Sequence, residues 1–164
     1  MNFKQSDFNE VRIVSALVNK IDAIDAAYVD KISDEIFQRQ PFFLTVLLGY
    51  RFDTTPIELE EIVRIYFLIW EYFRSNEQVQ SKKITEACFE EFQLKNIEML
   101  KYCEREPGNL EKMEIYASDI DSIKSKALLA AILFRLNSRP TLARMHENKR
   151  GMIFIGAKSF IKCF

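Results

Sequence analysis

Glycine and proline are scarce in this sequence, with four of each among 164 residues. Sheet-rich folds need many tight turns, and these two residue types make most of them, so their scarcity favours long helices with few connections. Hydrophobic residues make up 48% and charged residues 29%, which suits a globular protein rather than a disordered one. We therefore expect one all-α domain over residues 1–164, a bundle of five to seven helices of which two are long.

Histidine and cysteine are also too few for most metal and cofactor sites. His146 is the single histidine, which excludes a multi-histidine metal centre, and a di-iron bundle would need paired Glu-x-x-His motifs, whereas Ala143 stands three residues before it. Three cysteines, Cys88, Cys103 and Cys163, show no CxxC spacing and are interpreted as reduced, small hydrophobic residues. No glycine-rich phosphate loop is present. We expect no metal, no cofactor and no catalytic residue of these kinds.

The sequence has no apolar run long enough to cross a membrane. The longest candidate, around Ile62 to Phe73, is interrupted by Arg64 and closed by Glu71. The first ten residues, MNFKQSDFNE, lack the apolar core of a signal peptide. These features predict a cytoplasmic protein.

Charge of one sign does not dominate the chain, whose formal net charge is −1, but it is unevenly distributed. Residues 139–164 contain six basic side chains against Glu147 alone, so the rest of the chain is acidic overall. We expect this basic segment to pack on an acidic face of its own bundle. Two alternatives give it a partner: a nucleic acid held by its basic side chains, or a membrane surface that takes up apolar ones. The basic side chains that would contact phosphates are Lys149, Arg150, Lys158 and Lys162, and the apolar ones that would enter a membrane are Phe160, Ile161 and Phe164.

The segment 55–74, TPIELEEIVRIYFLIWEYFR, predicts the central helix. Thr55 is a good N-cap, Pro56 suits the first helical position, and Glu58 completes a capping box. The six consecutive apolar residues from Ile65 to Trp70 must be buried on nearly every side. The helix therefore contacts at least two neighbours.

Helical periodicity predicts the two long helices. An apolar stripe from Val11 to Ile36 indicates one helix from Asp7 to about Arg39, with a break near Ser33 as an alternative. A second stripe follows a heptad pattern, which predicts packing within the bundle rather than an intermolecular coiled coil. Two helices meeting near Ala117 are the alternative. The heptad residues are Met113, Tyr116, Ile120, Ile123, Ala127, Ala130 and Phe134.

Two further apolar segments could form either helices or strands. Residues 41–50, PFFLTVLLGY, predict a short buried helix that begins at Pro41. Residues 151–164 include MIFI, a strand-like run, yet Ile153, Ala157 and Phe160 share one helical face. We favour a helix for both.

One pattern resembles an enzyme family. Arg139 and His146 are separated by six residues in an all-helical chain, similar to the loose Arg-x(4–6)-His motif of HEPN ribonucleases. The resemblance implies an RNA-directed ribonuclease in which Arg139 and His146 act at an RNA phosphate. It covers only these two residues, and Pro140 stands where that family usually places a polar residue.

The sequence thus favours a non-enzymatic interaction or regulatory protein whose partner is a protein, either another copy or a different chain. HEPN-like RNA cleavage and nucleic-acid binding through the basic segment are the alternatives. The central helix has a second apolar face, and any part of it left uncovered would be the first place to look for a partner. The candidate surface consists of Ile65, Leu68, Tyr72, Lys149, Arg150, Lys158 and Lys162.

Overall fold

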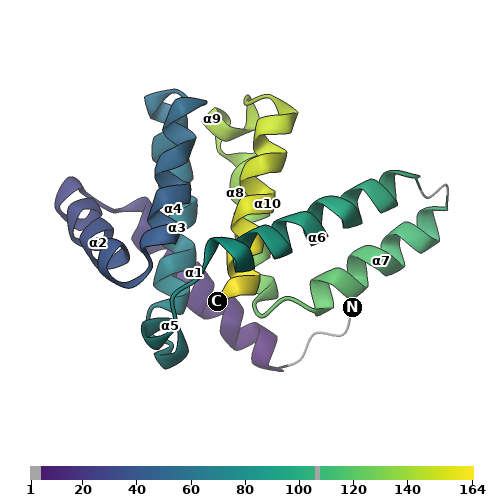
Figure 1. Cartoon of the computed structure of the whole chain (residues 1–164), viewed down its shortest axis with the longest axis horizontal. Coiled ribbons are helices and arrows are strands. Elements are labelled where there is room, and N and C mark those ends of the chain that lie inside the picture. Colours follow the sequence, from purple (N-terminus) through teal and green to yellow (C-terminus); the bar gives the residue numbers. More distant parts are fainter. Residues whose placement is uncertain (1–4, 106–107) are drawn as a thin grey trace.

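The computed structural model describes residues 5–105 and 108–164, and every regular element in these ranges is helical (Figure 1). The all-α prediction is confirmed, with 85% helix and no strand in the described part of the chain. The elements are α1 (Gln5–Asp22), α2 (Ala26–Arg39), α3 (Pro41–Gly49), the 3₁₀ turn η1 (Tyr50–Phe52), α4 (Pro56–Phe73), α5 (Glu77–Ser81), α6 (Glu86–Arg105), α7 (Asn109–Asp121), α8 (Lys126–Ser138), α9 (Pro140–Ala143) and α10 (Glu147–Cys163).

The described residues form ten α-helices, more than the five to seven expected, because each predicted long helix is divided in two and the short α5 forms between α4 and α6. The first division separates α1 from α2 at Asp25, whose carboxylate accepts a hydrogen bond from the backbone N–H of Tyr28 at 2.8 Å. No break occurs near Ser33. The apolar stripe continues across the division because α1 and α2 both face the core. Asp7 lies within α1 rather than at its start, and its side chain is outside the described residues.

The predicted heptad helix is divided between α7 and α8. Ser125 caps α8 and accepts a hydrogen bond from the backbone N–H of Leu128 at 3.1 Å. The heptad pattern did not identify the buried face, since Met113 and Phe134 are exposed. The turn at residues 122–125 breaks the phase that a continuous heptad requires. The core face of α8 consists instead of Leu128, Leu129, Ile132 and Leu136.

Helix α4 is the centre of the bundle, as predicted. The capping box is present: the N–H of Glu58 donates to Thr55 Oγ1 at 3.3 Å, and the N–H of Thr55 donates to Glu58 Oε2 at 2.8 Å. All six residues from Ile65 to Trp70 are buried. Helices α1, α3, α8, α9 and α10 all contact α4, which explains why its apolar residues surround the helix.

Residues 151–164 lie in α10 and residues 41–49 form α3, so both segments are helical, as predicted. Helix α10 covers one side of α4. Aromatic rings from the three helices form the middle of the core. Phe43 of α3 lies 4.7 Å from Phe160 of α10 and 5.2 Å from Tyr66 of α4, centroid to centroid. The last residue, Phe164, stacks on Phe73 at 5.0 Å.

Helices α6 and α7 form an arm that extends from the body of the bundle (Figure 1). The start of the arm packs closely along α10. Helix α7 buries none of its described side chains fully. The end of α7 is tied to α10 by Asp119, which accepts hydrogen bonds from Lys158 and, at 2.8 Å, from Lys162. In the part of the chain that the structure describes, no helix is long and apolar enough to span a membrane.

Candidate functional site

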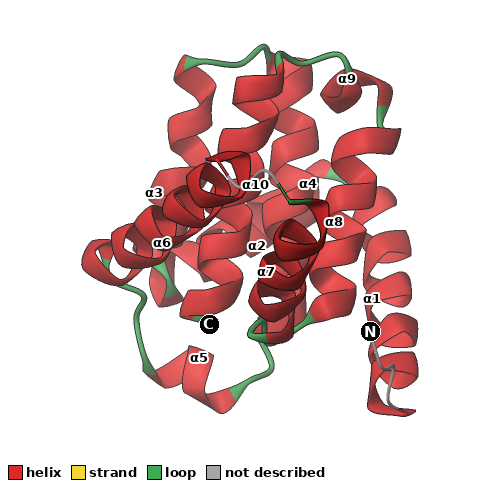
Figure 2. Cartoon of the chain, turned by 90° about the vertical axis from the view of Figure 1, so that its right-hand side faces the viewer, coloured by secondary structure: helices red, strands yellow, loops and turns green. Residues whose placement is uncertain are grey.

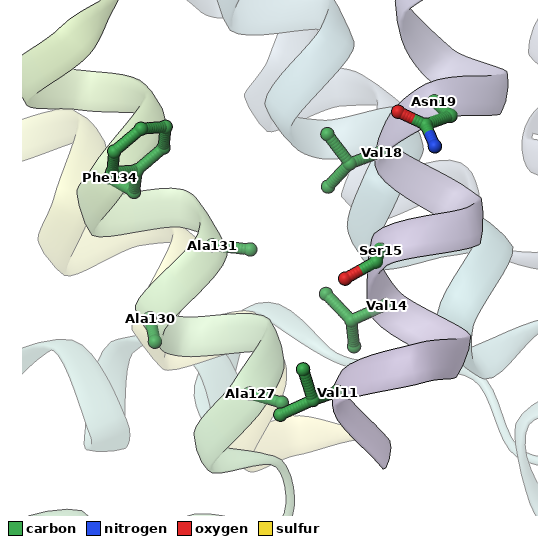
Figure 3. A pocket seen from close by; sticks show the side chains of 9 residues that line it. All are labelled: Val11, Val14, Ser15, Val18, Asn19, Ala127, Ala130, Ala131 and Phe134. Carbon is green, nitrogen blue, oxygen red and sulfur yellow. The ribbon is translucent and has the colours of Figure 1, made fainter. Parts of the chain in front are cut away.

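The candidate site is a groove between α1 and α8, which lie side by side at one edge of the bundle (Figure 2). Each helix turns its core stripe inward, with Val14 and Ile21 buried on α1 and Leu128 and Ile132 buried on α8. Next to these stripes, each helix carries further small or apolar residues that face the other helix and the solvent. The groove is lined by Val11, Val14, Ser15, Val18, Asn19, Ala127, Ala130, Ala131 and Phe134 (Figure 3).

The groove is apolar and open. Three alanines line it on the α8 side, and its volume is about 430 Å³. Val11 is 51% exposed and Phe134 is 74% exposed, so two of its large apolar side chains are left to solvent. Ser15 and Asn19 are its polar side chains, and both lie on α1. A small-molecule site is usually enclosed and has several converging polar groups, so these walls fit the apolar surface of another macromolecule better.

One end of the groove leads into a second hollow at the end of α8, which is mostly apolar but includes charged side chains. This second hollow shares Val18, Ala131 and Phe134 with the groove and continues to Asp22 and Arg139. The carboxylate of Asp22 pairs with both Arg135, at 2.7 Å, and Arg139, and Arg135 also donates to Glu61 at 3.3 Å. The groove therefore ends at two guanidinium groups that are balanced by two carboxylates.

The other end of the groove is fixed by Glu10. Its carboxylate accepts a hydrogen bond from the hydroxyl of Tyr72 at 2.5 Å and from the backbone N–H of Ala127 at 3.4 Å. Burial and the bond to Glu10 raise the pKa of Tyr72, so the phenol stays neutral and donates. Glu10 thus joins α1 to both α4 and α8, and it sets the spacing of the two helices that form the groove.

The residues of the surface predicted from the sequence do not form one surface. Ile65 and Leu68 are 0% and 1% exposed, because neighbouring helices cover this face of α4, although Leu68 lines the hollow at the end of α8. Tyr72 is half-buried and engaged with Glu10. Lys158 and Lys162 bind Asp119.

Near the start of α10, Lys149 donates to the carbonyl oxygen of Asp53 at 2.5 Å, and Arg150 donates to that of Ala143 at 3.4 Å. Together with the ion pairs of Lys158 and Lys162, these bonds hold basic side chains of residues 139–164 on groups of the same chain. Burial lowers the pKa of Lys158 even though Asp119 opposes that effect.

Arg139 and His146, the residues of the HEPN-like motif, stand on either side of α9 and each has a contact of its own. The guanidinium of Arg139 binds Asp22. His146 is the N-cap of α10, and its Nδ1 accepts from the backbone N–H of Asn148 at 3.2 Å. Among the described residues, no group of three or more His, Cys, Asp or Glu side chains is placed to hold a metal ion.

Sequence reasoning missed the groove although it noticed most of the residues that line it. Val11 and Val14 belong to the first apolar stripe, and Ala127, Ala130 and Phe134 belong to the heptad pattern. Both sets were assigned to the core, because periodicity shows which residues share a face but not how far a neighbour covers that face. Two polar residues of α1, Ser15 and Asn19, mark the border of its apolar stripe. They are the signal in the sequence that this side of the stripe faces solvent.

Comparisons with protein-family models, with curated protein sequences and with solved structures give no match for this chain. The groove and the charges around it are therefore the features from which a function can be inferred.

Proposed function

We propose that this chain is a non-enzymatic cytoplasmic protein that acts by binding another protein, and that the groove between α1 and α8 receives an amphipathic helix of that partner. The observation that supports the proposal is the open apolar groove itself, where Val11 and Phe134 remain in contact with water. Burying one large apolar side chain contributes about 1.5–3 kcal/mol, so covering both would favour association.

The shape of the groove suits a helix. Its alanine residues, Ala127, Ala130 and Ala131, permit a close approach, and packed helices lie roughly 8–10 Å apart. On α1 the lining runs from Val11 to Asn19, which at ~1.5 Å per residue corresponds to about two helical turns. A partner helix with apolar residues at positions i, i+3 or i+4, and i+7 would place one apolar face along this length.

The charges at the rim favour a partner with acidic residues beside its apolar face. Arg12 follows Val11 and lies one turn before Ser15, so it stands at the outer edge of α1, where it is exposed. At the far end, Arg135 and Arg139 are balanced by the carboxylates of Asp22 and Glu61. An acidic side chain on the partner would therefore meet Arg12 at one end of the groove, which mainly sets the orientation and rate of association.

Site-specific photocrosslinking tests the proposal. A benzophenone amino acid is introduced in place of Ala130, in the groove, and separately in place of Phe37, which is exposed on α2 and serves as the matched control. After irradiation in cytosol of the native cell, the expected result is a covalent adduct from position 130 that is absent from position 37. The crosslinked peptide should carry apolar residues at helical spacing with acidic neighbours.

Placing a charge in the groove tests the proposal by its effect on binding affinity. We expect Phe134→Asp to weaken binding of the captured peptide at least about tenfold, because each tenfold change in Kd corresponds to about 1.4 kcal/mol and a carboxylate would be desolvated there. Phe37→Asp should leave the affinity unchanged. Equal adducts from both positions, or an adduct with RNA or lipid, would contradict the proposal, whereas an adduct between two copies of the chain would assign the groove to self-association.

A further inference from the structure

Two cysteines that are far apart in the sequence meet in the structure. Cys88, in the first turn of α6, donates from its thiol to the sulfur of Cys163, at the end of α10, and the two Sγ atoms are 3.3 Å apart. Both are free thiols and both are partly exposed. A disulfide bond is about 2.05 Å long, so the two sulfurs need to approach by little more than 1 Å.

The pair opens into a small basic pocket. The pocket has a volume of about 260 Å³, and three lysines line it together with the two cysteines. Lys82 and Lys83 come from the segment before α6, and Lys124 comes from the turn between α7 and α8. The carboxylate of Glu91 is the acidic group that acts on Cys163 from α6. The surroundings are thus net positive, which favours the approach of an anionic reagent.

We propose that Cys88 and Cys163 form a reversible disulfide by exchange with a small anionic disulfide of the oxidised-glutathione type. In the first step, the Cys88 thiolate, having lost its proton to solvent, attacks one sulfur of the reagent, forms a mixed disulfide and releases one thiolate. In the second step, the Cys163 thiol loses its proton and attacks Cys88 Sγ, so that the protein disulfide forms and the second thiolate leaves. The reagent gains two electrons and the two cysteines lose them.

The order of attack follows from the surroundings of Cys163. Burial and the contact with Cys88 raise the pKa of the Cys163 thiol, and Lys124 only partly opposes this. Cys163 is therefore the resolving thiol. Its position next to Cys88 makes the second step intramolecular, which favours the protein disulfide over a lasting mixed disulfide.

The third cysteine provides an internal control. Cys103 lies near the other end of α6 and is 1% exposed, and its thiol donates to the sulfur of Met99 at 3.8 Å. Neither a partner cysteine nor an open pocket is shown for it among the described residues. The proposed exchange should therefore spare Cys103.

Mass spectrometry of the unmodified full chain tests the proposal. The protein is incubated with oxidised glutathione, the remaining thiols are blocked with N-ethylmaleimide, and the intact mass and peptides are measured. We expect a loss of about 2 Da, one blocked thiol at Cys103 and a linked peptide pair containing Cys88 and Cys163, all reversed by dithiothreitol. Cys163→Ser should stop at the glutathione adduct on Cys88, and Cys103→Ser should still form the disulfide. A linkage that involves Cys103, a linkage between two copies, or three blocked thiols would overturn the proposal.

The role of the lysines is tested by comparing two reagents on the same protein. Lys124→Gln should slow exchange with anionic oxidised glutathione about threefold or more, while the rate with neutral dithiodipyridine stays within error of the wild type. Added salt should reduce the glutathione rate of the wild type toward that of the variant. An equal change with both reagents would show that Lys124 acts on the position of the thiols and not on the charge of the pocket, and would overturn this part of the proposal.

Discussion

Glu71 shows how much a single buried residue can determine. Its side chain is 5% exposed at the end of the apolar run of α4, and it joins three helices. Lys20 of α1 donates to it at 2.9 Å, Tyr28 of α2 donates to the same carboxylate, and Arg74, which follows α4, donates at 2.9 Å. In the sequence, Glu71 is recognised only as the charge that ends an apolar stretch. Its role was not predicted, because no local pattern indicates that donors 43 and 51 residues away will surround it.

The hydrogen bonds to Glu71 make stability depend on pH in the acidic range. Burial alone would raise its pKa, but the bonds from Tyr28, Lys20 and Arg74 lower it overall from the ordinary value of 4.5. The unfolded chain therefore takes up this proton at a higher pH than the folded chain does. The contribution of Glu71 to stability is fully present above about pH 4.5 and is lost as the pH falls through the lowered value.

We expect Glu71→Gln to reduce the free energy of unfolding at pH 7 by about 2 kcal/mol, because hydrogen bonds to a charged group are weakened. The variant should also lose less stability than the wild type between about pH 5 and about pH 3. Urea denaturation at several pH values measures both effects. Glu60→Gln is the matched control, since Glu60 is 64% exposed in its pair with Arg64 and should change stability by less than about 1 kcal/mol. Parallel pH profiles for the wild type and Glu71→Gln would refute the assignment.

At the scale of the helix, the sequence predicted those features whose causes are local. The start of α4 was predicted because Thr55 and Glu58 bind each other's backbone within one turn. The division at Asp25 was missed, and the division at Ser125 was foreseen only as an alternative near Ala117, because the apolar stripe continues across both cap residues. The groove was missed for a related reason: its exposure depends on how α1 and α8 are spaced, and Glu10 sets that spacing from a distance of 62 residues along the chain from Tyr72.

Helix α10 contains two glycines with opposite expected roles. A Cβ atom at Gly156 would lie 2.6 Å from Tyr50 Oη and 2.9 Å from Tyr66 Oη, whose hydroxyls are 2.8 Å apart. Burial raises the pKa of both tyrosines, so they remain neutral phenols. At Gly151, a Cβ atom would meet nothing within 4 Å. Gly156 therefore lets α10 approach the tyrosine pair, and Gly151 has no such packing role.

We expect Gly156→Ala to destabilise the protein by about 1–3 kcal/mol, since the tyrosine hydroxyls must move apart. Gly151→Ala should instead stabilise it by up to about 1 kcal/mol, because alanine is the better helix former. Thermal and urea denaturation of the two variants measure the difference, and each serves as the other's control for helix propensity. Similar effects of the same sign would mean that α10 is not held against the tyrosine pair.

At the scale of the whole molecule, the two helices of the arm are held in different ways. Helix α6 packs along α10, whereas α7 depends mainly on Asp119 near its end. Burial would raise the pKa of Asp119, but the bonds from Lys158 and Lys162 lower it overall. The cluster of Asp119, Lys158 and Lys162 thus joins α7 to α10, and α10 in turn packs on α4. The acidic partner of these lysines therefore lies within the chain, and its one carboxylate balances one of their two positive charges.

Removing Asp119 should release α7 and leave the central bundle folded. In Asp119→Ala, Lys158 stays buried at 3% exposure without its carboxylate, a loss on the order of 3 kcal/mol for a buried pair. Because α7 buries no described side chain fully, the loss should appear locally: backbone amides of α7 should exchange hydrogen at least about tenfold faster, with a much smaller change in α4. Hydrogen exchange followed by mass spectrometry measures this. Glu114→Ala removes an exposed carboxylate from the same helix and should exchange as the wild type does. If both variants accelerate exchange equally, apolar contacts hold the arm and the ion cluster does not.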